Sequence, residues 1–133
     1  MGDEGLKVGG DLVTSALERD PSGKGAHEAG AKLDDGKNRL GLVLLSFSRA
    51  LGEVGNVGTY GAKKYSDNGW LSVERGDERY TDAMLRHLLA ENVEGEIDSE
   101  TGLFHKAQTA WNALARLELF LIELDNEAKE VLR

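Results

Sequence analysis

Apolar residues recur at every third or fourth position along most of the chain after residue 40. Between residues 40 and 66 this stripe includes Leu44, Phe47, Leu51 and Val54. A spacing of three and four is typical of an amphipathic helix with one apolar face. The pattern therefore predicts a first helix over 40–66.

Two further helices follow from the same pattern. The stretch RYTDAMLRHLLAENVE predicts a helix that begins near Asp77 and is ended by Gly95, because glycine is the preferred residue just past a helix end. A long third helix is expected from about Leu103, with Ser99 or Thr101 as its cap. No segment convincingly predicts a strand, so the fold class is all-α. Three principal helices make a thin core, which favours a helical bundle of three to four main helices completed by oligomerisation.

The first 36 residues differ from the rest. They are rich in glycine, contain the proline of the chain, Pro21, and show no sustained apolar period. Such segments bury too little apolar surface to offset the entropy of ordering. We expect a flexible N-terminal arm over 1–36 and an all-α domain over 37–133.

Composition limits the function further. The chain has 133 residues, a formal net charge of −8 and no cysteine. Disulfides and thiolate zinc sites are therefore excluded, and the acidic balance argues against binding to nucleic acid or to an anionic membrane. A small anionic ligand is still compatible with this net charge, if a bound divalent cation reverses the charge at its site. Without a signal peptide or a transmembrane run, we expect a soluble cytoplasmic protein.

The stretch GEIDSETGLFH carries the densest polar chemistry. It places Glu96, Asp98 and Glu100 between two expected helices that each offer a histidine, His87 and His105. If those helices run antiparallel, both histidines lie near the carboxylates. Oxygen ligands with histidine suit Mg²⁺ or Mn²⁺. The alternatives are a solvated helix connection and, for His87, a hydrogen-bonded core histidine.

Basic and aromatic side chains could complete a nucleotide site. Basic residues, which can neutralise phosphate, occur near both ends of the first helix and on the second: Lys37, Arg39, Lys63, Lys64 and Arg86. Tyr65 and Trp70 flank a turn, SDNGW, and either stack on a base or pack under the loop. Surface solvation is the alternative for each lysine.

Three segments together carry a family resemblance: YGAKKYSDNGW, LRHLLA and GEIDSETGLFHKAQTAWNALARLEL. They resemble a phage and bacterial family of dATP/dGTP diphosphohydrolases, with members called MazZ, similar to the MazG-like all-α nucleoside triphosphate pyrophosphohydrolases. The resemblance covers about Lys37 to Leu119. It implies cleavage between the α- and β-phosphates of a purine deoxynucleoside triphosphate (dGTP, dATP or both), which would control the nucleotide pool during phage replication.

The resemblance also implies roles for individual residues. As metal ligands for Mg²⁺ or Mn²⁺ it implies Glu53, Glu96, Asp98 and Glu100. As catalytic ligands or bases it implies His87, Glu96 and His105. As substrate-binding residues it implies Lys37, Arg39, Lys64, Tyr65, Trp70, Arg86 and Asn112. A homodimer or homotetramer is expected. Many members have a histidine where this chain has Gln108, which affects metal affinity if that histidine is a ligand.

Two other classes of function remain open at this point. One is a nucleotide- or metal-binding helical module without catalysis, which would bind nucleotide and release no product. The other is a structural or interaction bundle, which would assemble without responding to nucleotide.

Overall fold

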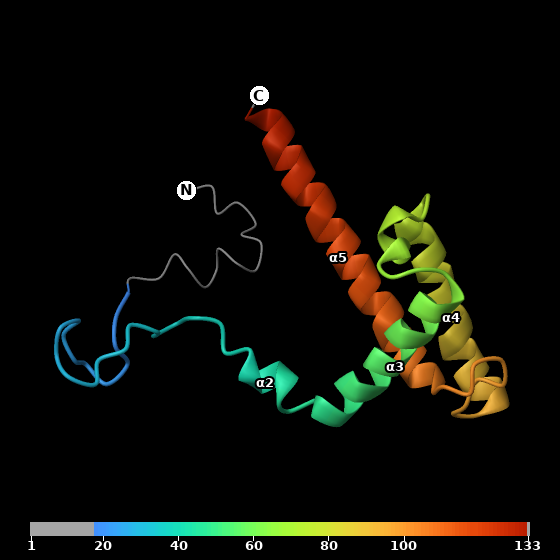
Figure 1. Ribbon diagram of the computed structural model, residues 1–133, viewed down its shortest axis with the longest axis horizontal. Helices are drawn as coiled ribbons and strands as arrows, with labels where there is room; N and C mark the ends of the chain where they lie inside the picture. The colour runs from blue at the N-terminus through green and yellow to red at the C-terminus, as the bar shows by residue number, and fades with distance from the viewer. Residues whose placement is uncertain (1–17, 133) are drawn as a thin grey trace. The chain divides into compact units, whose positions relative to one another are not determined.

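The computed structural model describes residues 18–132 (Figure 1), and the part of the predicted arm before Glu18 lies outside them. Contacts group the chain into two compact units, one ending at Ser46 and the other beginning at Phe47. Each unit is described here by itself. The predicted domain boundary after residue 36 stays a prediction.

Helices make up the regular structure of residues 18–132, which confirms the all-α class. Their bounds are α2 (Gly41–Leu44), α3 (Ser48–Lys64), the short 3₁₀ helix η1 (Gly69–Ser72), α4 (Gly76–Glu94) and α5 (His105–Val131). Within this part of the chain there is no strand, only an isolated antiparallel bridge between Ile97 and Phe104.

The prediction of one continuous helix over 40–66 is wrong in its first half. The helix α2 ends at Leu44, and α3 begins only at Ser48. Every side chain from Leu40 to Ala50 is exposed, so no tertiary packing supports a helix there. Short helices depend on such packing.

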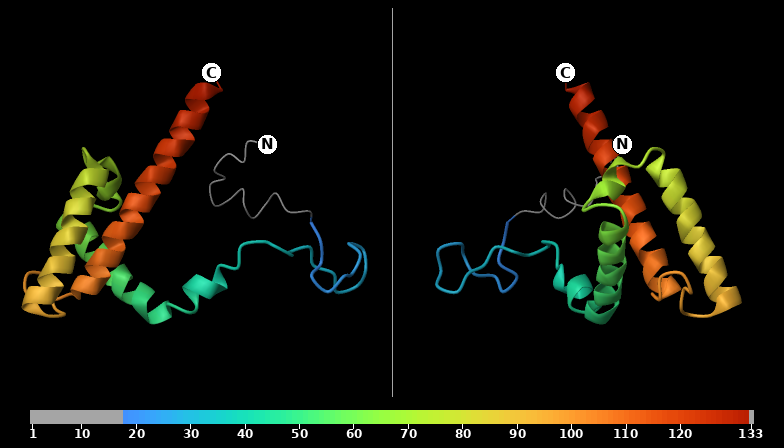
Figure 2. Two further views of the ribbon diagram at one scale, coloured as in Figure 1. Left: turned by 180° about the vertical axis from the view of Figure 1, so that it is seen from behind. Right: turned by 45° about the vertical axis from the view of Figure 1, so that its right-hand side comes forward.

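The second unit is built on an antiparallel hairpin of α4 and α5, which Figure 1 shows joined by the loop 95–104. The prediction that Gly95 ends α4 is confirmed. Its φ of 102° is a conformation that glycine adopts without strain, and its N–H bonds to the carbonyl of Glu91. The helix α3 packs on α5, and Figure 2 shows these helices from two further directions.

The predicted cap of the third helix is wrong. Phe104 is the N-cap residue of α5, and no side chain caps the helix. The hydroxyl of Thr101 instead donates to Asp98 and accepts a hydrogen bond from the N–H of Leu103. The Thr101 hydroxyl therefore forms hydrogen bonds within the loop 95–104 and does not cap α5.

The predicted apolar stripes are only partly covered within the chain. Among residues 18–132, the buried apolar residues are two alanines of α5, Ala107 and Ala115. Leu88 on α4 is 52% exposed and Leu117 on α5 is 54% exposed. The helices form as the periodicity predicts, but the hairpin and α3 leave much of their apolar surface open.

The described part of the first unit contains a closed loop. Oδ1 of Asp20 accepts a hydrogen bond from the N–H of Ser22 at 2.7 Å, and Oδ2 accepts one from the N–H of Lys32 at 2.7 Å. Arg19 forms an ion pair with Asp35 at 2.7 Å. These contacts hold residues 19–35 together without a helix.

Candidate functional site

Two histidines and one aspartate converge where the loop 95–104 joins α4 to α5. Nδ1 of His87 lies 3.0 Å from Nδ1 of His105. One ligand atom from each of His87, Asp98 and His105 lies within 4.8 Å of the others. His105 is 2% exposed and Asp98 is 8% exposed, and both are polar groups that proteins bury only with partners. We call these three residues the histidine–aspartate cluster.

Asp98 is held by hydrogen bonds on both carboxylate oxygens. Oδ1 accepts one from the N–H of Glu100 at 3.0 Å, and Oδ2 accepts one from Nε2 of Gln108 at 3.0 Å and another from the Thr101 hydroxyl. Burial opposes ionisation, but the hydrogen bonds outweigh it and lower the pKa of Asp98. The carboxylate is therefore charged at neutral pH and fixed in direction.

The loop backbone sets the position of this carboxylate. The N–H of Asp98 donates to the carbonyl of Leu103, and the N–H of His105 donates to the carbonyl of Glu96. Gly102 has a φ of 72° and lets the chain reverse between these bonds. The residue pattern of the loop thus places Asp98 inside and His105 at the first position of α5.

The two histidines differ in their surroundings. Nε2 of His105 lies 3.2 Å from a carboxylate oxygen of Glu94. A proton on Nε2 that bonds to Glu94 leaves the lone pair of Nδ1 directed at His87. Burial lowers the pKa of His87 and so favours its neutral form. Neutral imidazoles with free lone pairs are the form that binds metal ions.

The other predicted carboxylates lie apart from this cluster. Glu96 is exposed and forms an ion pair with Lys106 at 2.6 Å, and Glu100 is exposed and lies 3.6 Å from Lys64. Glu53 lies on α3, where its carboxylate accepts a hydrogen bond from Asn56. The structure brings Asp98 together with both histidines and does not group Glu53, Glu96 or Glu100 with them. Their assignment as ligands stays a prediction.

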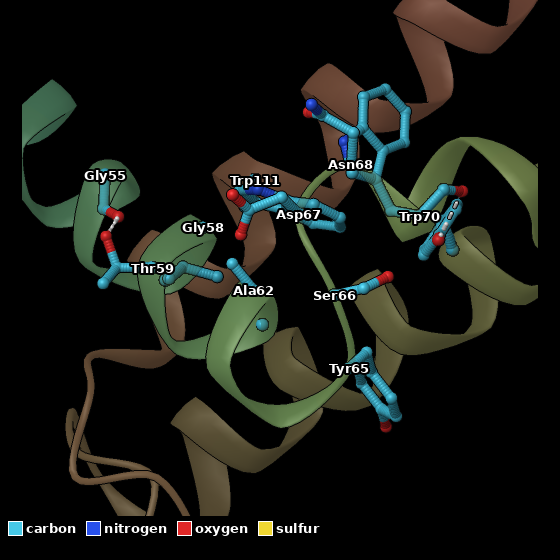
Figure 3. A pocket seen from close by; sticks show the side chains of 13 residues that line it. Gly55, Gly58, Thr59, Ala62, Tyr65, Ser66, Asp67, Asn68, Trp70 and Trp111 are labelled. Atoms are coloured by element: carbon cyan, nitrogen blue, oxygen red, sulfur yellow. Dashed lines mark hydrogen bonds between the residues drawn. The ribbon is translucent and has the colours of Figure 1, made fainter.

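A pocket of about 590 Å³ lies between α3, the turn that follows it, and α5 (Figure 3). Trp111 approaches α3 at Gly58, where an added Cβ would lie 3.6 Å from Nε1 of the indole. Trp70 and Trp111 meet edge to face, with ring centroids 5.8 Å apart, and Tyr80 joins both. Aromatic walls with a few polar groups are typical of small-molecule sites. We call this the aromatic pocket.

The predicted substrate-binding residues fall into three groups. Tyr65 and Trp70 line the aromatic pocket, although Trp70 also packs against Tyr80 and Trp111. Asn112 is buried on α5 and donates to the carbonyl of Gln108 at 2.8 Å. The basic residues are exposed: Lys64 at the end of α3, Arg86 beside His87 on α4, and Lys37 and Arg39 in the first unit, whose position relative to the pocket is not described.

Sequence reasoning singled out Gln108 but missed its hydrogen bond to Asp98, and it missed Glu94 altogether. Glu94 follows His87 by seven residues, and Gln108 follows His105 by three, so each lies on the same helix face as its histidine. Helical spacing from each histidine was the signal that could have found them. Tyr80 carried no such signal, because it reaches Trp111 only through the packing of α4 on α5.

Fold and site together define an all-α protein with a histidine–carboxylate cluster, of which Asp98 and His105 are buried, and an aromatic pocket in the same unit. This chain belongs to the family described as dATP/dGTP diphosphohydrolase, N-terminal, which matches residues 27–129. It is 37% identical over 81 residues to a dATP/dGTP diphosphohydrolase of Salmonella phage PMBT28. The aligned part covers 61% of this chain and 26% of that protein, so the chain spans about a quarter of its relative. No solved structure matches the chain. The predicted family is confirmed.

Proposed function

We propose that this chain hydrolyses purine deoxynucleoside triphosphates, dGTP, dATP or both, to the monophosphate and pyrophosphate. The observation that supports this most is the presence of the histidine–aspartate cluster and an aromatic pocket in one helical unit, in a chain of this family. Both features draw on residues of α4 and α5: Tyr80 and Trp111 line the pocket, and His87 and His105 belong to the cluster. At ~1.5 Å per residue, Trp111 lies about 9 Å along the axis of α5 from His105.

The aromatic pocket is the proposed site of the base. Tyr65, Trp70 and Trp111 offer ring faces or edges to a purine, and Asp67 and Asn68 add polar groups to the lining. Stacking on aromatic rings stabilises any base by ~1–3 kcal/mol and does not by itself select one. Selection between guanine and adenine is therefore assigned to the polar groups of the lining, Asp67 and Asn68. Asn112, which is buried on α5 and lies outside this lining, remains proposed as a further substrate contact.

The phosphates are proposed to lie toward the cluster. A divalent cation, Mg²⁺ or Mn²⁺, supplies Lewis acidity and acidifies a bound water when it is present. Asp98, His87 and His105 would hold it, since each offers a donor atom and these atoms lie within 4.8 Å of one another. Glu53, Glu96 and Glu100 remain proposed as further ligands, Glu96 also as a catalytic group. Lys64 and Arg86 are proposed to neutralise phosphate oxygens. For Lys37 and Arg39 of the first unit the same role stays a prediction from the sequence. An in-line attack on the α-phosphate then gives pyrophosphate as the leaving group.

A second candidate function is a nucleotide- or metal-binding module without hydrolysis. The partial coverage of the relative favours it, because the chain matches only 26% of a longer protein named for the activity. In that case this chain binds a ligand and another part of the protein performs the chemistry.

Self-association is the proposed state of the helical unit. An apolar groove of about 720 Å³ runs between α3, η1 and α5 and is lined by residues such as Leu51, Val54, Leu117 and Leu121. A second copy of this chain is the proposed occupant, in a homodimer or homotetramer, because α5 continues well beyond the part that α4 covers (Figure 2). Light scattering after gel filtration tests this, and a monomer at micromolar concentration contradicts it. A groove that is filled by another segment of a longer protein also contradicts it.

The biological setting is proposed from the family. None of the helices in residues 18–132 combines the length and the apolar character that crossing a membrane requires. We propose a MazG-like enzyme that acts in the cytoplasm, during phage infection, on the pool of purine deoxynucleotides.

Separation of products by ion exchange tests the proposed function. The chain is incubated with each deoxynucleoside triphosphate and Mg²⁺ or Mn²⁺, with a chelator as control. The expected products are dGMP or dAMP and pyrophosphate, abolished by the chelator. A nucleoside plus triphosphate contradicts the reaction class. Nucleotide binding without any product supports the binding module instead.

A further inference from the structure

We infer that His87, Asp98 and His105 are three ligands of one site that selects a transition-metal ion, such as Mn²⁺ or Zn²⁺, over Mg²⁺. The inference deepens the proposed function and rests on it for the use of the ion. It concerns which class of cation the side chains of this chain prefer.

The first support is the distance between the two ring nitrogens. Two imidazole nitrogens that bind one ion at ~2.0–2.1 Å lie about 2.9–3.4 Å apart at octahedral to tetrahedral angles. Nδ1 of His87 and Nδ1 of His105 lie 3.0 Å apart. The Asp98 carboxylate supplies a third donor within 4.8 Å of the ring nitrogens. The three donors are therefore grouped as candidate ligands of one ion, and a set of three ligands leaves further positions for water or phosphate.

The second support is the set of contacts behind the ligands. Histidine ligands usually donate their other ring N–H to a carboxylate, which fixes the tautomer. Nε2 of His105 lies 3.2 Å from the Glu94 carboxylate, so His105 has a carboxylate partner for its other ring N–H. Gln108 and Thr101 hold Oδ2 of Asp98 in the same way. Glu94 and Gln108 are positioning residues for the site.

The donor chemistry then selects the ion. Mg²⁺ prefers an octahedral shell of oxygens and keeps several waters, whereas imidazole suits Mn²⁺, Zn²⁺ and other transition metals. Two of the three grouped donors are nitrogens. The nearby carboxylates that would favour Mg²⁺, Glu96 and Glu100, are exposed and paired with Lys106 and Lys64.

The competing explanation is a hydrogen-bonded histidine pair without an ion. A shared proton between the two Nδ1 atoms satisfies the rings alone. A cation satisfies both rings and also neutralises the buried charge of Asp98, which its hydrogen bonds stabilise but do not cancel. The two explanations differ in whether the folded chain binds metal.

Calorimetric titration of the chelator-treated chain with Mn²⁺, Zn²⁺ and Mg²⁺, without nucleotide, tests the inference. We expect one ion per chain, Zn²⁺ bound more tightly than Mn²⁺, and Mg²⁺ at least ~10-fold more weakly than Mn²⁺. Loss of the electron paramagnetic resonance signal of free Mn²⁺ provides an independent readout. No metal binding by the folded chain, or equal affinity for Mg²⁺ and Mn²⁺, overturns the inference.

Variants locate the site. His87→Ala and His105→Ala should each abolish this binding, while His27→Ala, which removes an exposed histidine of the first unit, should not change it. Asp98→Asn has a matched control in Asp20→Asn, because Asp20 also accepts the N–H two residues later. Because His105 is buried and its variant could misfold, Gln108→Ala is added: we expect Zn²⁺ binding ~10–100-fold weaker with unchanged circular dichroism. Binding unchanged in His87→Ala and Gln108→Ala overturns the assignment.

The two proposals fail separately. Metal binding at the cluster with no nucleotide turnover keeps this inference and removes the proposed enzyme. Turnover that survives His87→Ala with Mg²⁺ alone keeps the enzyme and removes this site.

Discussion

The two halves of α5 have the same helical pattern and opposite surroundings. The first half, from His105 to Ala115, contains every buried residue of the helix, and three of these five residues are polar. The second half has no buried residue, and Leu117, Phe120 and Ile122 are exposed. Proteins usually bury apolar side chains and expose polar ones, whereas α5 buries polar side chains in its first half and exposes apolar ones in its second half.

This contrast separates what makes a helix from what gives it a role. Alanine, leucine, glutamate and lysine favour helix in both halves, so propensity alone accounts for the length of α5. Burial depends on neighbours, and the residues of α5 that become buried all lie in the first half, although Gly76 at the start of α4 also meets Leu119 in the second half. Buried polar groups cost free energy unless they are bonded, which indicates a chemical role for the first half. An open apolar surface indicates a partner for the second.

The largest effect is expected from the carboxylate at the buried end. Asp98→Asn removes one ligand charge but keeps the size of the side chain, and we expect turnover to fall at least ~100-fold. Glu96→Gln is the informative companion, since Glu96 was predicted as a ligand but is exposed and paired with Lys106. Pyrophosphate release measures the turnover. Equal losses of turnover in Asp98→Asn and Glu96→Gln would favour the carboxylate set predicted from the sequence over the histidine–aspartate cluster.

A smaller effect is expected at the open end. Replacing both Leu117 and Phe120 by serine removes apolar contacts worth ~1.5–3 kcal/mol each when fully buried. If a second copy covers this surface, self-association weakens at least ~10-fold while the helix content stays, because the residues are exposed in the single chain. Sedimentation at several concentrations measures this. An unchanged assembly would place the interface elsewhere.

Gly76 lies where the start of α4 meets the second half of α5. An added Cβ at Gly76 would lie 2.9 Å from Cδ1 of Leu119 and 3.5 Å from the ring of Tyr80. We expect Gly76→Ala to lower the free energy of unfolding by ~1–3 kcal/mol, because the neighbours must move. Urea denaturation measures it, with Gly52→Ala as control, since nothing lies within 4 Å of a Cβ there. Equal stability of Gly76→Ala and the parent chain would mean that Leu119 moves freely.

The smallest effect is expected at the aspartate turn of the first unit. Hydrogen bonds from the Ser22 hydroxyl and then from the backbone of Lys32 lower the pKa of Asp20. Because this pKa lies below that of the unfolded chain, about 3.9, the stabilisation is present above that pH and is lost as the pH falls through the folded pKa. Titration of the Asp20 carboxyl by NMR, with the amide signals of Ser22 and Lys32, measures it. An ordinary pKa would contradict the bonding.

Much of the fold could be predicted from the chain itself. The apolar period gave α4 to within one residue of its start, and Gly95 gave its end, because helix formation and termination are local properties. The same locality explains the failure at 45–47. Periodicity predicts a helix there, but the residues from Leu40 to Ala50 are exposed in the described part of the chain, and a short helix without packing does not persist.

The sequence by itself determined which side chains could meet: two histidines on adjoining helices and a loop with three carboxylates between them. Only the tertiary structure decided which carboxylate joins the histidines. The N–H of Asp98 bonds to the carbonyl of Leu103, and that of His105 to the carbonyl of Glu96, so the loop folds back on itself. Asp98 then faces Gln108, while Glu96 and Glu100 turn to lysines at the surface. Spacing fixes faces on a helix, but in a loop the direction of each side chain depends on hydrogen bonds between residues distant in the chain.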